Sequence, residues 1–179
     1  MPSDAERDSE RVNQIYDSLR KTLLNKKYYG RRLATYKAYN FSFELLIALG
    51  ATGSGVAGFA VWQTSIGTTI WAAVSGLSAI LAIAKPLLKL TEQIEIYAKL
   101  YGEYTTTFEK MKVLIDDLQV DKVITLDLIK TFNELRIRST ELAGLGDPRL
   151  NQLLISECEK EVNLEINVER LWDPGVDDN

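Results

Sequence analysis

The spacing of apolar residues divides the chain into a helical N-terminal segment, an uncharged central stretch and a helical C-terminal region. In the N-terminal segment apolar side chains recur at helical spacing, which predicts an amphipathic helix from about Asp8 towards Arg32. Residues 1–10 are polar and contain no apolar run of the kind found in a signal peptide. The apolar positions of the predicted helix are Val12, Ile15, Tyr16, Leu19, Leu23 and Leu24.

The central stretch, residues 45–84, contains no Asp, Glu, Lys or Arg. A surface helix of a soluble protein needs one polar face, so an uncharged run of this length is typical of membrane segments. Residues 45–62 and 71–90 are each long enough to cross a hydrocarbon core about 30 Å thick as a helix. The uncharged turn at residues 63–69 joins them, so the sequence predicts a transmembrane helical hairpin.

Basic and aromatic residues mark the two ends of this hairpin. Seven basic residues and no acidic residue lie between Arg20 and Lys37. Under the positive-inside rule this cluster predicts that both termini are cytoplasmic and that the turn faces outward. Aromatic belts mark membrane interfaces, and Trp62 and Trp71 flank the turn. The basic residues assigned to the cytoplasmic interface are Lys26, Lys27, Arg31, Arg32, Lys37, Lys85 and Lys89.

Small residues line one face of each predicted membrane helix, which lets two helices approach closely in lipid. We expect these faces to pack against each other. The hydroxyl groups of the hairpin could instead line a pore in an oligomer, but no ring of charges supplies ion selectivity, so packing is favoured. The small-residue positions are Gly50, Gly53, Ser54, Ala57 and Gly58 in the first helix, and Ala72, Ser75, Gly76 and Ala79 in the second.

Helical spacing continues after the hairpin, so the second membrane helix is expected to bend near Pro86 and extend into a long cytosolic helix. Asp121 or Thr125 can cap the next helix, residues 144–146 stop it, and Asp147 with Pro148 begins a final helix. The predicted fold is therefore all-α. Its parts are a basic N-terminal helix (1–40), a transmembrane hairpin (41–90), a cytosolic helical region (91–172) and a disordered tail (173–179).

Composition removes several classes of chemistry. The chain has 21 basic and 25 acidic side chains and no histidine, which excludes Ser-His and Cys-His nucleophile pairs and histidine-ligated metal sites. We therefore predict no enzyme, no cofactor, no metal and no nucleic-acid partner. The G-x-G-x-x-G match at residues 53–58 lacks the strand and the following acid of a dinucleotide site.

The remaining charged and polar residues have plain interpretations. Glu44 is placed at the start of the first membrane helix, where the helix dipole favours an anion. Paired Asp116 and Asp117, and the group Glu157, Glu159 and Glu161, are interpreted as solvated helix faces. The single Cys158 falls on an apolar helix side and is expected in a core.

The layout resembles the bacterial SLATT family, the two-transmembrane effector domains associated with SMODS and SLOG proteins. The resemblance covers about residues 10–145 and rests on the basic-aromatic segment 26–32, the hairpin 45–90, and the long helix with Tyr97, Leu100, Tyr101 and Tyr104. It implies an inner-membrane effector of an antiviral or abortive-infection system, which forms a pore or disrupts the membrane when triggered. It assigns no messenger-binding residue to this chain.

We therefore expect an oligomeric membrane effector whose partners are the lipid bilayer, further copies of itself, and a nucleotide-sensing or nucleotide-producing defence protein. Two alternatives remain open. One is a non-enzymatic membrane adaptor that recruits a defence protein. The other is an α-helical pore-forming protein that is soluble until its apolar hairpin is released.

Overall fold

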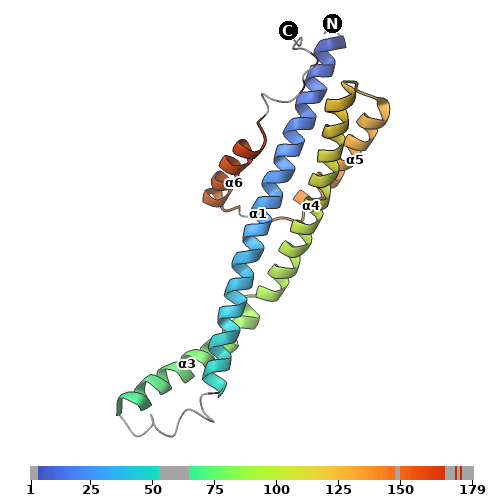
Figure 1. The fold of residues 1–179 in the computed structure, drawn as a ribbon. Helices are drawn as coiled ribbons and strands as arrows, with labels where there is room; N and C mark the ends of the chain where they lie inside the picture. The colour runs from blue at the N-terminus through green and yellow to red at the C-terminus, as the bar shows by residue number, and fades with distance from the viewer. Residues whose placement is uncertain (1–3, 53–64, 148–149, 168–171, 173, 175–179) are drawn as a thin grey trace. The chain divides into compact units, whose positions relative to one another are not determined.

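The computed structural model describes residues 4–52, 65–147, 150–167, 172 and 174 of the chain. Every regular element within these residues is a helix, which confirms the predicted all-α class (Figure 1). The helices are α1 (Asp4–Thr52), α3 (Ser65–Leu87), α4 (Leu90–Asp121), α5 (Leu126–Ala143) and α6 (Gln152–Glu165).

Helix α1 is one continuous element, where the sequence predicted an N-terminal helix followed by a separate membrane helix. No proline occurs between Asp4 and Thr52, so nothing in the backbone forces a break. Gly30 is tolerated because it allows close packing: a Cβ atom there would lie 3.1 Å from the ring of Tyr101. The placement of Glu44 at a helix start is therefore wrong, because Glu44 lies well inside α1.

The chain divides into two compact units. Unit 1 comprises residues 1–31 and 97–179, and unit 2 comprises residues 32–96. In unit 1 the predicted apolar face of α1 packs against α4, α5 and α6 around one hydrophobic core. Its buried members are Val12, Ile15, Tyr16, Leu19, Leu23, Phe108, Met111, Leu114, Ile115, Leu118, Phe132, Leu135 and Val162.

Unit 2 pairs the end of α1 with α3 in antiparallel directions. The Ser78 hydroxyl donates a hydrogen bond to the backbone oxygen of Leu46 at 2.9 Å. Gly50 lies against Ser78 so closely that an added Cβ atom would overlap the serine side chain. Near the C-terminal end of α3, the Lys85 ammonium group is 2.7 Å from the Glu44 carboxylate. These contacts hold the two helices as a hairpin base.

The helix ends follow local signals. Thr125 caps α5 by accepting a hydrogen bond from the backbone N–H of Leu128 at 3.2 Å, and Gly144 is its C-cap, as predicted. Helix α3 ends just after Pro86, and Lys89, with a φ of 49°, takes the left-handed conformation before α4 begins. Asn151 caps α6, so the prediction that Asp147 begins the final helix is wrong.

Among the described residues, no helix by itself has the length and hydropathy that crossing a membrane requires. The segments Ala72–Leu87 and Leu90–Asp121, bent by 49° at their break, meet that requirement as a pair. The predicted first crossing lies outside the described residues from residue 53 onward.

Burial in unit 1 predicts a large difference between two leucine variants. Leu118 is fully buried, so Leu118→Ala should lower the free energy of unfolding by about 2 to 5 kcal/mol through lost burial and a cavity. Leu126 is 86% exposed, and Leu126→Ala should change it by less than about 0.5 kcal/mol. Urea unfolding followed by circular dichroism measures both values, and equal losses would contradict the assigned core.

Candidate functional site

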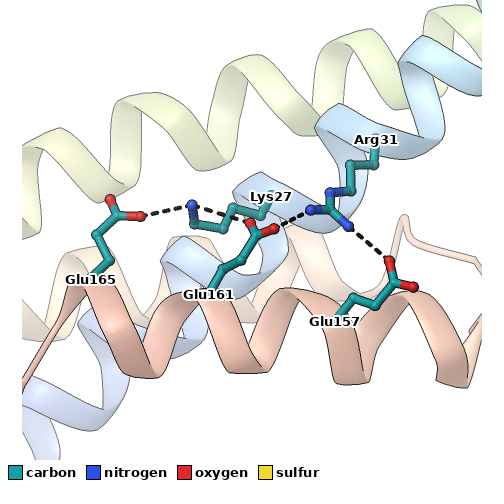
Figure 2. A network of polar contacts seen from close by, with 5 residues as sticks. All are labelled: Lys27, Arg31, Glu157, Glu161 and Glu165. Atoms are coloured by element: carbon teal, nitrogen blue, oxygen red, sulfur yellow. Dashed lines mark hydrogen bonds and ion pairs between the residues drawn. The ribbon is translucent and has the colours of Figure 1, made fainter.

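The most organised set of charged side chains lies where α6 packs on α1. Figure 2 shows Glu157, Glu161 and Glu165 projecting from α6 towards Lys27 and Arg31 of α1. The acids are spaced by four residues and so are the bases, which places each set on one helix face. We call these five residues the charge seam.

The charge seam is continuous because its central acid contacts both bases. Lys27 is 2.7 Å from Glu165 and 3.5 Å from Glu161. Arg31 is 2.9 Å from Glu157 and also pairs with Glu161 (Figure 2). The order of the contacts shows that α6 runs antiparallel to α1.

Both apolar and polar contacts join α6 to the rest of unit 1. Cys158 and Val162 are the buried residues of α6, so the expectation that Cys158 is a core residue is confirmed, and burial raises the pKa of its thiol. The hydrogen bond to Glu165 raises the pKa of Lys27 and holds its positive charge. The paired side chains are 25% to 64% exposed, however, and such ion pairs each stabilise by about 0.2 to 1 kcal/mol and weaken with salt. The exposed ion pairs therefore add a salt-sensitive contribution to the contacts that hold α6, which also include the Arg20–Asn163 hydrogen bond and the packing of Val162 and Ile166 on the core.

The charge seam changes the interpretation of both sets of residues. Glu157 and Glu161 are 64% and 42% exposed, as expected for a solvated helix face, but each also pairs with a base of α1, which the sequence did not predict. Lys27 and Arg31, which the sequence assigned to a membrane interface, are occupied by acidic partners. Lys26 is likewise 3.2 Å from Glu109 of α4.

Glu165 was missed by the sequence reasoning. Its spacing of four residues from Glu161, matching that of the two bases, was the available signal.

A buried tyrosine cluster lies beside the charge seam in unit 1. Tyr29 stacks on Tyr104, with ring centroids 5.6 Å apart, and on Tyr97, at 6.1 Å. The Tyr97 hydroxyl donates to both oxygens of Asp147, at 2.7 and 2.8 Å, and the Tyr28 hydroxyl donates to the same carboxylate at 3.4 Å. These bonds explain why Asp147 does not cap α6: its carboxylate ties the loop before α6 to α1 and α4.

The remaining predicted interface residues lie in unit 2 or outside the described part of the chain. The Arg32 guanidinium lies over the Tyr36 ring at 5.1 Å, and Lys37 is exposed. Lys89 pairs with Glu92 at 3.2 Å, whereas Lys85 pairs with Glu44 as described above. Trp71 lies in α3, and Trp62 lies outside the described residues.

The contacting face of α3 differs from the predicted small-residue face. Ser78 makes the close contact with α1, whereas a Cβ atom at Gly76 would meet nothing within 4 Å, and Ala72 and Ala79 are exposed. Ser75 is half-buried. The Ser78 hydroxyl lies 2.9 Å from two backbone oxygens, that of Leu46 in α1 and that of Val74 in its own helix. Of the first helix's small residues, Gly53, Ser54, Ala57 and Gly58 lie outside the described residues.

The arrangement is suited to electrostatic binding and release. Within the described residues, no group of three His, Cys, Asp or Glu side chains is placed to hold a metal ion.

No protein-family model, curated protein or solved structure matches this chain.

Reversing the central charge of the seam should release α6. Glu161→Lys places a third positive charge between Lys27 and Arg31. The amide hydrogens of α6 should then exchange roughly tenfold faster, which is the effect expected from losing a network of exposed ion pairs. Leu164→Lys, at a position of α6 that is 86% exposed, is the control and should leave exchange nearly unchanged. Hydrogen exchange followed by mass spectrometry measures both variants. Equal protection of α6 in both would show that the seam does not hold it.

The tyrosine cluster predicts a specific loss of stability at alkaline pH. Burial, with a smaller contribution from Tyr29, raises the pKa of Tyr104 from 10.0 to about 12. The unfolded chain therefore releases this proton first, and stability falls as the pH rises from about 10 towards about 12. Between pH 9 and pH 11, Tyr104→Phe should lose up to roughly 1.4 kcal/mol less stability than the unchanged chain.

Urea unfolding at pH 9 and pH 11 tests this prediction, with Tyr101→Phe as the control because Tyr101 is 39% exposed. The same alkaline loss in Tyr104→Phe and in the unchanged chain would contradict it.

Proposed function

We propose that this chain is an oligomeric two-span effector of the bacterial inner membrane, with both termini cytoplasmic, which damages the membrane when a defence system is triggered. The observation that carries the proposal is the exposed apolar surface of unit 2 within the uncharged stretch. Soluble monomers rarely expose contiguous apolar patches larger than a few hundred Å². The exposed large apolar residues of this unit include Leu45, Leu46, Leu49, Ile70, Leu77, Ile80, Ile83 and Leu87.

The charges at the edge of this stretch support a hairpin that enters and leaves the membrane on one side. Glu44 and Lys85 are the first charged residues before and after the uncharged run, and they form an ion pair with each other. Pairing reduces the cost of placing either charge near lipid. Residues 45–84 then form the part of the hairpin in the hydrocarbon core.

Association of several copies is supported by the face of α3 that the single chain leaves open. Gly76, Ala72 and Ala79 are accessible on α3, and small residues let helices approach closely where no hydrophobic effect drives them together. A second copy can therefore pack on this face while Ser78 keeps the contact within the chain.

Control of the effector is proposed to reside in unit 1. Helix α6 is proposed as the element that is displaced, because the ion pairs that join it to α1 are exposed and weaken with salt. Displacement by a sensor partner or a nucleotide signal would rearrange the helices of unit 1 and convert packed hairpins into a leak. The resemblance to the SLATT family supports the bacterial defence setting of this proposal.

A charge on the apolar face of α3 should abolish membrane integration and killing. Ile80 is 64% exposed, and Ile80→Asp should cost about 2.5 to 3.5 kcal/mol on insertion scales if this face contacts lipid. Ile137→Asp, in α5 at a position that is 60% exposed, is the matched control and should remain membrane-bound. Alkaline extraction of membranes and potassium leakage from expressing cells measure the two effects.

Three outcomes distinguish the alternatives. Integration without leakage under activating conditions would favour a membrane adaptor, and release of the unchanged chain by alkaline extraction would favour a soluble pore-forming protein. Leakage by Ile80→Asp after it fails to integrate would contradict the proposed function. For the topology, a cysteine introduced as Ser65→Cys should react with an impermeant reagent in intact spheroplasts, while one introduced as Ser156→Cys, at an exposed position of α6, should not.

A further inference from the structure

An open groove with a volume of about 530 Å³ runs along α4 and the beginning of α5 in unit 1. On α4 its lining includes Glu109, Val113, Asp117 and Asp121, which are spaced by four residues and so share one helix face. At a rise of 1.5 Å per residue this face is about 18 Å long, or three helical turns. The other wall is the α4–α5 connection and the first turns of α5.

The floor of the groove is apolar and partly open to solvent. Val113 is 60% exposed and Val123 is 57% exposed, while Leu114 beneath them is buried. Covering apolar area stabilises a complex by about 25 cal/mol per Å² before the costs of association. The groove therefore offers binding energy to a complementary apolar surface.

The walls of the groove are acidic. Asp117, Asp121 and Asp127 line it and are exposed, and none of the three forms an ion pair with another residue in the described part of the chain. A fourth carboxylate, Glu109, pairs with Lys26, and Lys110 is the single basic lining residue. The field in the groove therefore attracts positive charge and discriminates against an acidic occupant.

We propose that this groove is a docking surface for a basic amphipathic helix of a partner protein. A groove between two helices accepts the ridge of a third, and the length of the face fits a helix of about three turns. The fitting helix has one row of apolar side chains for Val113 and Val123, flanked by Lys or Arg residues for the three aspartates. All lining residues belong to unit 1, so the surface does not depend on the proposed membrane function.

The test uses the purified full chain and a fluorescent synthetic peptide of about 15 residues with an apolar row flanked by Lys and Arg. Fluorescence anisotropy should show binding that weakens as salt rises from about 0.05 to about 0.3 M. A peptide of the same composition, scrambled to remove the apolar row, should bind at least about tenfold more weakly.

Variants of the chain locate the binding site. The double variant Asp117→Lys/Asp121→Lys should weaken binding by about tenfold or more, because it reverses the charge of one wall. Asp116→Lys is the matched control: Asp116 is exposed on α4 but does not line the groove, and its change should alter binding less than about twofold. Val113→Asp tests the floor: binding should weaken although the added carboxylate attracts a basic peptide, so a loss reports the apolar contact. Circular dichroism checks that each variant keeps its helical content.

Three results would overturn the proposal. The first is equal binding of the ordered and scrambled peptides. The second is equal loss in Asp116→Lys and in the double variant. The third is self-association of the unchanged chain that Val113→Asp abolishes, with no peptide binding, which would assign the groove to a second copy.

Discussion

Both compact units are built on one continuous helix, α1, and most of the remaining structure depends on it. Its first half presents Val12, Ile15, Leu19 and Leu23 to the core of unit 1. Its last turns provide Glu44, Leu46 and Gly50 for the contacts with α3. A helix can run without interruption where no proline intervenes. One helix therefore contributes both to the hydrophobic core of unit 1 and to the contacts with α3 in unit 2.

The two units are held by different kinds of interaction. Unit 1 has a conventional apolar core, to which α6 is added through exposed ion pairs and two buried side chains. In the described part of unit 2, large apolar side chains are exposed, and the contacts between α1 and α3 include the Ser78–Leu46 hydrogen bond and the Lys85–Glu44 ion pair. The ion pairs of α6 are therefore more sensitive to salt than the apolar core of unit 1.

The chemistry of unit 1 is that of charge recognition. The charge seam joins an acidic helix to a basic one within the chain, and the acidic groove between α4 and α5 leaves carboxylates available to a basic partner. Surface charges contribute more to partner choice and association rate than to stability.

The sequence by itself determined the all-α class, the apolar face of α1, the Thr125 and Gly144 caps and the burial of Cys158. Each of these follows from helical spacing or from a local backbone signal, which neighbouring residues are enough to specify. Tertiary structure alone decided that Lys27 and Arg31 meet Glu157, Glu161 and Glu165, and that Asp147 accepts from Tyr97 instead of capping α6. It also selected Ser78 over the small-residue face of α3. These contacts are between residues that are distant in the sequence. The partner of a charged or hydroxyl side chain is set by which groups the packing of the helices places within bonding distance.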